Sequence, residues 1–155
     1  DRLQKLIVVD MGVKAYMPHH NHILAAIHAI DLTVLSARSQ AEAILCKYID
    51  SDGVRQFLLK NLFWKEKGQL AWRVNFSVLE KSMPEILSAL PKVESFTTTL
   101  FIRGELSNYI LDEDISDLES HYPDMHLATV PNAGHWVHAE APDLFIDEVL
   151  AFSLR

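Results

Sequence analysis

The sequence contains a single cysteine, Cys46, among its 155 residues. One thiol excludes an internal disulfide bond, and no second Cys stands near a His at the spacing of a zinc finger. We therefore expect Cys46 to be a small buried apolar residue. Glycine and proline are also scarce, with five and six residues, which excludes collagen-like and low-complexity chains.

The sequence also lacks an excess of basic residues. Its 14 Lys and Arg face 21 Asp and Glu, a formal net charge of -7, and no basic stripe could neutralise a phosphate backbone. No apolar run approaches the roughly 18 residues that span a bilayer. Neither nucleic acid nor a membrane is an expected partner. The chain begins at Asp1 rather than Met, so the sequence does not decide whether a leader precedes it, and we expect a cytoplasmic location.

The sequence does provide apolar material for a core, with 49% hydrophobic and 23% charged residues. Three short apolar runs, each ended by turn residues, are typical of buried strands: residues 6–9, 99–102 and 126–130. Helical periodicity follows the second and third runs, over 110–121 and 142–154. Alternating strands and helices indicate an α/β fold with a mostly parallel sheet.

The interval between the first two strands is far longer than a strand-to-strand crossover needs. Its apolar residues have helical spacing around 23–30, 41–48 and 54–62, residues 69–76 have an extended character, and 83–90 favour one more helix. We predict a helical cap over residues 14–95, between a core strand and turn at 1–13 and core strands and helices at 96–155. Such a cap would cover the carboxyl edge of the sheet, where ligands bind; an insertion that only fills space is the alternative.

Polar side chains follow the predicted strands at their carboxyl ends, which lie along one edge of a parallel sheet. His135 follows Gly134 after the third strand, where an imidazole can accept and return a proton near neutral pH. Asp10 follows the first strand directly and can orient that imidazole. Alone, each residue also fits a structural role, as a loop His bonded to a carbonyl or an Asp capping a turn. Together they predict part of a hydrolytic relay.

Histidines also gather at positions 19, 20, 22 and 28, and His135 and His138 stand three residues apart. A zinc site needs three or four converging ligands, and no carboxylate or Cys joins these histidines at a recognisable interval. We expect a solvated helix face and no metal site. A metal-dependent hydrolase, which a chelator would inactivate, is a further alternative.

Residues 132–140, Asn-Ala-Gly-His-Trp-Val-His-Ala-Glu, lie between a predicted strand and an amphipathic last helix. This segment resembles the catalytic-histidine segment of the α/β-hydrolases. The likeness is strongest to the small esterase and acyl-CoA thioesterase branch, which includes bacterial esterases and mitochondrial abhydrolase-domain proteins. Residues 6–10, 54–62, 72–75 and 100–104 agree with it, so the resemblance covers almost the whole chain.

The resemblance implies the C-terminal part of an α/β-hydrolase that cleaves a small-molecule acyl ester or thioester and needs no cofactor. It makes His135 the catalytic base. In many members the acid follows the penultimate strand in a Gly-x-x-Asp setting, where this chain has Ser107. In the branch that it resembles, the acid follows the earlier strand, which corresponds to Asp10. The weaker candidates for the acid are Glu105, Asp112 and Asp114.

Aromatic residues are candidates for an apolar acyl-binding wall. Trp136 is expected beside the imidazole, and a purely structural Trp is the alternative. The candidates within the predicted cap are Phe57, Phe63, Trp64, Trp72 and Phe76. At helical spacing, each of these is more often part of a cap core.

The family's nucleophile elbow, Gly-x-Ser-x-Gly, is missing from the sequence, and Ser36, Ser39 and Ser107 lack its setting. Because the triad order is Ser, acid, His, we expect the N-terminal part of the same hydrolase to supply the serine and the oxyanion hole. Three strands are also fewer than the usual five or six. We therefore expect this segment to be inactive alone and to expose a sheet edge. The alternative is a non-catalytic binding or interaction module derived from an α/β-hydrolase.

Overall fold

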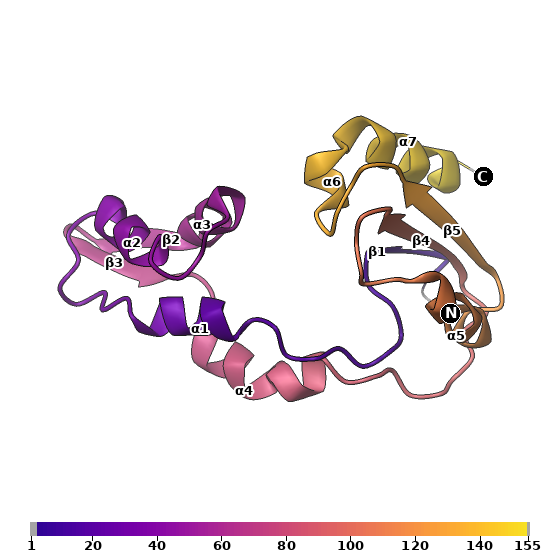
Figure 1. Ribbon diagram of the computed structural model, residues 1–155, viewed down its shortest axis with the longest axis horizontal. Coiled ribbons are helices and arrows are strands. Elements are labelled where there is room, and N and C mark those ends of the chain that lie inside the picture. The colour runs from indigo at the N-terminus through magenta and orange to yellow at the C-terminus, as the bar shows by residue number, and fades with distance from the viewer. Residues whose placement is uncertain (1–2, 155) are drawn as a thin grey trace. The chain divides into compact units, whose positions relative to one another are not determined.

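The computed structural model describes residues 3–154, and the chain folds as two compact units (Figure 1). The core unit comprises Asp1–Ala15 and Ala89–Arg155, and the inserted unit comprises Tyr16–Ser88. Each unit has its own cluster or clusters of buried apolar side chains.

In its described part, the core unit is built on a three-stranded sheet of order β1-β4-β5. β1 (Lys5–Val9) and β5 (Met125–Val130) both run parallel to the central strand β4 (Thr98–Gly104). These strands read as continuous apolar runs because both faces of the sheet are covered. The predicted α/β fold with a parallel sheet is therefore confirmed.

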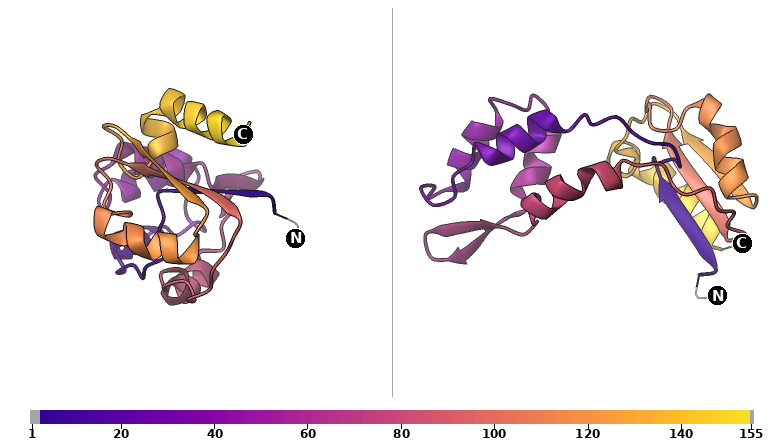
Figure 2. Two further views of the ribbon diagram at one scale, coloured as in Figure 1. Left: turned by 90° about the vertical axis from the view of Figure 1, so that its right-hand side faces the viewer. Right: turned by 90° about the horizontal axis from the view of Figure 1, so that it is seen from below.

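Helices cover both faces of this sheet (Figures 1 and 2). Helices α6 (Val137–Glu140) and α7 (Pro142–Ser153) lie on one face, and α5 (Ile115–His121) lies on the other. Because successive strand residues point to opposite faces, Ile102 joins the cluster under α6 and α7, while Phe101 joins the cluster under α5. The first cluster contains Leu100, Ile102, Val130, Ala133, Val137 and Phe152, and the second contains Val13, Phe101, Ile110 and Leu118.

The helix predicted over 110–121 begins later than expected. A 3-10 turn, η1 (Asp112–Asp114), precedes α5. The carboxylate of Asp114 accepts the N–H of Leu111 at 2.8 Å, so an acidic side chain caps the backbone where the periodicity alone predicts a helix.

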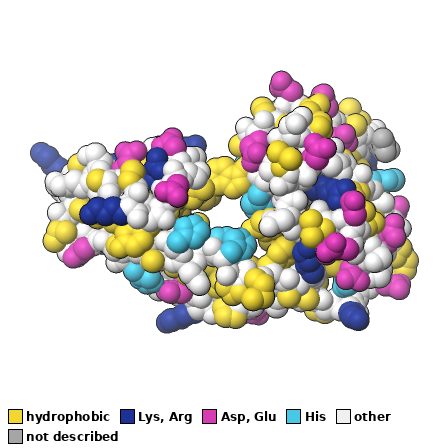
Figure 3. Space-filling view, viewed as in Figure 1, with side chains coloured by type: hydrophobic (Ala, Val, Ile, Leu, Met, Phe, Trp, Pro, Cys, Tyr) yellow, Lys and Arg dark blue, Asp and Glu magenta, His cyan; other side chains and the backbone are white. Residues whose placement is uncertain are grey.

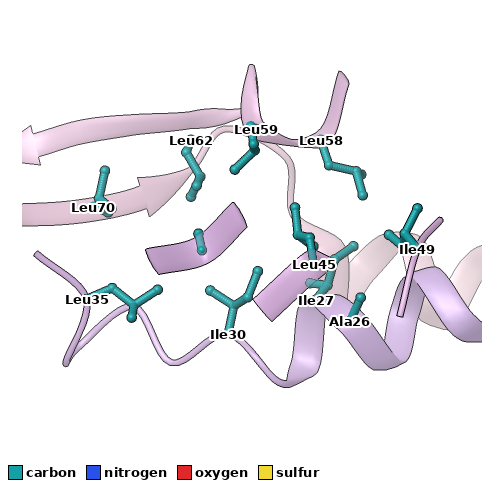
Figure 4. Close-up of a cluster of buried hydrophobic side chains, with 11 residues drawn as sticks. Ala26, Ile27, Ile30, Leu35, Leu45, Ile49, Leu58, Leu59, Leu62 and Leu70 are labelled. Atoms are coloured by element: carbon teal, nitrogen blue, oxygen red, sulfur yellow. The ribbon is translucent and has the colours of Figure 1, made fainter. Parts of the chain in front are cut away.

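The inserted unit, all of whose residues are described, contains four helices and one antiparallel hairpin. The helices are α1 (Asn21–His28), α2 (Arg38–Leu45), α3 (Asp52–Leu59) and α4 (Phe76–Ile86), and the hairpin pairs β2 (Leu62–Glu66) with β3 (Gln69–Trp72). Its core consists of Ala26, Ile27, Ile30, Leu35, Ala41, Leu45, Ile49, Leu58, Leu59, Leu62 and Leu70 (Figure 4).

Two elements of this unit differ from the predictions. β2 was not expected, because Leu62 continues the helical spacing of the residues before it. Periodicity alone cannot tell the end of a helix from the start of a short strand. Gly68, at a φ of 83°, makes the turn into β3. The helix predicted at 83–90 overlaps the end of α4 but has the wrong bounds, because α4 begins after Asn75, whose side chain accepts the N–H of Val78 at 3.3 Å, and ends at Ile86. Pro84, a typical helix-start residue, lies near the end of this helix.

Cys46 is exposed, so the expectation of a buried thiol is wrong. It is the C-cap of α2 and directly follows Leu45, which is fully buried. One step along a helix turns the side chain by about 100°, which carries Cys46 away from the buried face.

The two stretches of chain that lead into and out of the inserted unit, which form its neck, are joined by backbone hydrogen bonds. Within this unit, the N–H of Tyr16 donates to the carbonyl of Leu87 at 2.8 Å. Within the core unit, the N–H of Leu90 donates to the carbonyl of Val13 at 2.9 Å. The two strands of chain that lead into and out of the insertion are therefore hydrogen-bonded on both sides of the junction.

On the face shown in Figure 3, Lys and Arg side chains are scattered among Asp and Glu and form no continuous patch. None of the helices described for residues 3–154 has both the length and the apolar character needed to cross a membrane.

Candidate functional site

The site is centred on Asp10, the residue that ends β1. Its backbone N–H donates to the carbonyl of Ile102 at 2.7 Å, which extends the pairing of β1 with β4 by one bond. Its φ of 46° lies in the left-handed region, which Asp tolerates better than most residues because its short polar side chain bonds locally. The side chain is completely buried. The end of the strand therefore fixes a carboxylate inside the core unit.

Three hydrogen-bond donors converge on the Asp10 carboxylate. The N–H of Gly104 donates to Oδ1 at 3.2 Å. The hydroxyl of Ser107 donates to Oδ2, and Nδ1 of His135 bonds the same oxygen at 2.7 Å. A buried carboxylate is strongly disfavoured unless its oxygens are bonded, and these donors meet that requirement.

The bond to Asp10 determines which nitrogen of His135 carries the proton. An ionised carboxylate only accepts hydrogen bonds, so Nδ1 is the donor, and Nε2 of the neutral ring keeps its lone pair. The side chain of His135 is 41% exposed, so the imidazole is reachable from solvent. This arrangement gives the ring the tautomer of a general base.

The ring of Tyr109 stacks on the imidazole of His135. The ring centroids are 3.8 Å apart and the planes are inclined by 16°. The backbone N–H of Tyr109 donates to Oγ of Ser107 at 3.2 Å. Burial and, to a smaller extent, the charge of Asp10 raise the pKa of Tyr109 above its usual range, so its phenol stays neutral around pH 7.

A second carboxylate, that of Glu140, holds the backbone around His135. Its Oε2 accepts the N–H of Gly134 at 2.8 Å, and its Oε1 accepts the N–H of Trp136 at 3.1 Å. These are the two residues that flank His135. The last residue of α6 therefore fixes the histidine on both sides.

The loops after β4 and β5 touch through their backbones. A Cβ atom on Gly104 would lie 2.2 Å from the carbonyl oxygen of Gly134 and 2.4 Å from that of Ala133. The N–H of Leu106 also donates to the carbonyl of Ala133 at 2.9 Å. A side chain at position 104 would therefore separate the loop that carries Ser107 from the loop that carries His135.

The other acid candidates bind elsewhere. Their partners are the N–H of Asn132 for Glu105 at 2.9 Å, the side chain of Arg103 for Asp112 at 2.7 Å, and the side chain of Lys14 for Asp114. The carboxylate that the structure brings to His135 is that of Asp10.

The aromatic candidates occupy different settings. Trp136 is half-buried next to His135, and the ring that stacks on the imidazole is that of Tyr109. Trp72 packs against the core of the inserted unit and meets Phe76 edge to face at 5.1 Å. Phe57 is 54% exposed and Trp64 is 47% exposed. These last two present apolar surface on the inserted unit.

Two of the clustered histidines, His19 and His28, have polar partners within the inserted unit. Nδ1 of His19 lies 2.9 Å from the carbonyl oxygen of Met17, and Nε2 of His28 lies 3.0 Å from the carboxylate of Glu80. Among residues 3–154, the structure contains no group of three or more His, Cys, Asp or Glu side chains that is arranged to hold a metal ion.

The sequence pattern does not place Tyr109 and Glu140 beside His135. In the sequence, Ser107 stands where many α/β-hydrolases carry the acid and lacks the setting of a nucleophile, and neither feature predicts its bond to Asp10. A signal was present, since Ser107 and Tyr109 follow β4 at the edge that carries Asp10. The sequence contains a weaker signal for Glu140, which is a carboxylate shortly after His135 in the chain.

Comparisons with known proteins give relatives along almost the whole chain, although no protein-family model matches it. The chain is 33% identical to the mouse sn-1-specific diacylglycerol lipase ABHD11, over 98% of this chain and 52% of the relative. It is 36% identical to esterase YbfF of Escherichia coli, over 92% of this chain and 55% of the relative. Among solved structures, a marine microorganism esterase superposes with a TM-score of 0.92 and 38% identity, covering 98% of this chain and 61% of that one. The chain thus spans about half the length of the curated relatives it matches.

Proposed function

The chain belongs to the α/β-hydrolase superfamily, and we propose that it supplies the acid and the base of a serine hydrolase that cleaves carboxylic esters or thioesters. Asp10 is the acid and His135 is the base. The observation that carries this proposal is the 2.7 Å bond between Nδ1 of His135 and the buried carboxylate of Asp10. The names of the relatives, which are esterases and a diacylglycerol lipase, support ester cleavage.

In this mechanism, Nε2 of His135 takes the proton of a serine hydroxyl while the serine oxygen attacks the substrate carbonyl. The imidazolium that forms is stabilised by Asp10. It then returns the proton to the departing alcohol or thiol, which leaves an acyl-enzyme. His135 activates a water molecule in the same way, and the carboxylic acid is released.

The serine comes from outside these 155 residues in this proposal. A nucleophilic serine is hydrogen-bonded to Nε2 of the base, whereas the hydroxyl of Ser107 donates to Asp10 and accepts the N–H of Tyr109. The bonds of Ser107 therefore fit a residue that orients the acid. We propose that a segment upstream of Asp1 provides the nucleophile elbow and the oxyanion hole, in accord with the greater length of the relatives.

The inserted unit is the cap of this hydrolase in our proposal. Three of its aromatic side chains are candidates for the acyl-binding wall: Phe57 and Trp64, which are exposed, and Trp72, which packs against the core of the unit. Trp136, next to the base, is the candidate contributed by the core unit.

The test is Asp10→Asn in the protein with its upstream segment. We expect kcat/KM for a short p-nitrophenyl ester to fall by about 10³- to 10⁴-fold, because an amide favours the wrong tautomer of the imidazole. Asp112→Asn is the matched control, since the side chain of Asp112 is 85% exposed and binds Arg103, and it should keep full activity. Activity of Asp10→Asn within a few-fold of wild type would contradict the assignment.

A fluorophosphonate probe separates the hydrolase from a non-catalytic module that lacks a nucleophile. In the hydrolase, intact mass spectrometry shows one serine labelled in the upstream segment or in a companion fragment that co-purifies. If no species is labelled and no companion is found, the module is supported. Loss of activity with a chelator would instead indicate a metal-dependent hydrolase.

A further inference from the structure

We propose that Tyr109 is a positioning residue for His135, whose stacked ring fixes the plane of the imidazole and stabilises the imidazolium that forms during catalysis. This proposal rests on the proposed role of His135 as the base. It goes beyond that role, because it assigns a function to a side chain outside the acid and base pair.

The first argument is geometric. Among the described residues, the imidazole of His135 has one hydrogen-bond partner, at Nδ1, and its side chain is 41% exposed. A single bond leaves the ring free to pivot, because the torsion that orients a His ring has a broad energy well. A second ring 3.8 Å away and inclined by only 16° blocks that pivot from one face. Tyr109 therefore supplies the constraint that Asp10 alone does not give.

The second argument is electrostatic. The face of an aromatic ring carries partial negative charge and attracts a cation within about 6 Å. The imidazolium formed when His135 takes a proton lies at this distance from the ring of Tyr109. Since burial and the charge of Asp10 raise the pKa of Tyr109, its ring acts as a neutral phenol in the working range.

The residue that carries the stacked ring is linked to Asp10 through Ser107. The backbone N–H of Tyr109 donates to Oγ of Ser107, whose hydroxyl donates to Asp10. The next residue, Ile110, is almost completely buried, which holds the segment against the core. The stretch from Ser107 to Ile110 thus delivers both a ligand of the carboxylate and a support for the imidazole.

Three carboxylates contact the histidine loop, one at the imidazole ring and two at backbone N–H groups. The carboxylate of Asp10 faces the ring edge at Nδ1, Glu140 binds the N–H groups of both neighbours of His135, and Glu105 binds the N–H of Asn132. All three carboxylates are unchanged in variants of Tyr109. A change in pH dependence in such variants therefore reports on the aromatic ring.

The experiment compares Tyr109→Phe with Tyr109→Leu in the protein with its upstream segment. Tyr109→Phe keeps the aromatic face, and we expect kcat within about twofold of wild type. Tyr109→Leu removes it, and we expect kcat to fall roughly tenfold with KM nearly unchanged. We also expect the acid limb of the kcat/KM profile to move to lower pH by about half a unit, because the imidazolium loses its stabilising face.

A spectroscopic measurement separates this proposal from the proposed function. In ¹³C-histidine-labelled protein, ring currents from Tyr109 shift the Hε1 resonance of His135 upfield, and His135→Gln identifies that resonance. The upfield shift should persist in Tyr109→Phe and disappear in Tyr109→Leu. If Asp10→Asn keeps its activity while this pattern holds, the proposed function fails and the stacking stands.

The positioning role is overturned if Tyr109→Leu keeps the wild-type kcat and acid limb, or if its Hε1 resonance stays upfield. Thermal melting followed by circular dichroism shows whether this variant is folded. If it is not, Tyr109→Met, which fills more of the same volume without an aromatic face, replaces it with the same expected changes in kcat, acid limb and Hε1 shift.

Discussion

At the scale of single residues, Ser107 shows how the core unit accommodates an acid at the end of β1. Many α/β-hydrolases carry the acid at the position of Ser107, after the penultimate strand. In this chain the proposed acid is Asp10, and the hydroxyl of Ser107 donates to its carboxylate. A small donor therefore occupies the position where many α/β-hydrolases carry the acid, and it bonds the carboxylate that we propose as the acid of this chain.

Removing this donor should weaken both the site and the fold. In Ser107→Ala, the buried Asp10 carboxylate loses one of its three hydrogen bonds. We expect the free energy of unfolding to fall by about 1–3 kcal/mol, and kcat/KM to fall roughly tenfold. Urea denaturation and ester hydrolysis measure the two effects. Ser107→Thr keeps the hydroxyl and should retain most of both quantities, so equal losses in the two variants would assign the effect to packing.

At the scale of elements, the strands of the core unit were predictable from the sequence. β1, β4 and β5 are apolar runs bounded by turn residues, and burial on both faces produces that pattern directly. β2 was not predictable in the same way, because Leu62 fits the end of a helical stripe as well as the start of a strand. Helical spacing likewise predicted that the helix α5 would begin at residue 110, but the 3-10 turn η1 precedes α5, and the carboxylate of Asp114 bonds the backbone there.

The candidate site was predictable to the extent that parallel strands bring it together. Asp10 and His135 follow strands whose carboxyl ends share an edge, so the sequence predicts that they meet. The positions of Tyr109 and Glu140 in the sequence place them near this edge, but their contacts with His135 and its neighbours were not predictable, because these depend on how three loops fold against one another. Such contacts leave no periodic pattern in the sequence.

The helix α6 has a testable role in the site through its last residue. Glu140→Ala removes the acceptor of the N–H groups on both sides of His135, so we expect kcat/KM to fall roughly tenfold as the loop loosens. Glu140→Gln keeps one acceptor oxygen, so its kcat/KM should lie between those of wild type and Glu140→Ala. Steady-state kinetics on the ester measure the effect. Glu148→Ala, at another exposed carboxylate on α7, is the control and should behave as wild type; an equal loss there would refute a specific role for Glu140.

The contact between the loops after β4 and β5 predicts a large effect from one methyl group. In Gly104→Ala, the new Cβ would meet backbone oxygen atoms at 2.2 and 2.4 Å, and backbone cannot rotate aside. We expect a loss of about 3 kcal/mol in the free energy of unfolding. In Gly53→Ala, within α3, the nearest atom is Oγ of Ser51 at 3.9 Å, and a gain of about 0.5–1 kcal/mol is expected. Equal denaturation midpoints for these two variants would contradict the close approach at Gly104.

At the scale of the whole molecule, the sheet leaves β1 with one strand partner in the described chain. β4 pairs on both sides, whereas β1 pairs with β4 alone. Each residue of β1 remains half-buried, while four consecutive residues of β4 are fully buried. An unpaired edge of this kind presents free N–H and carbonyl groups that can pair with another chain.

We therefore expect the 155-residue chain alone to self-associate at tens of micromolar. Sedimentation velocity should show species larger than the monomer. Leu3→Lys, which places a charge at the exposed residue just before β1, should reduce that association because an edge charge disfavours pairing. A wild-type chain that sediments as a monomer and melts cooperatively would contradict this expectation.

The neck of the inserted unit has a consequence for how this fold can diversify. Lys5 of β1 pairs with Thr98 of β4 although the whole inserted unit lies between them in the sequence. The entropy of closing a loop grows only with the logarithm of its length, so each doubling costs about 0.6 kcal/mol. The bonds from Tyr16 to Leu87 and from Leu90 to Val13 close the junction regardless of what lies beyond it. The insertion can therefore be lengthened, shortened or exchanged as a module while the sheet that carries Asp10 and His135 keeps its pairing.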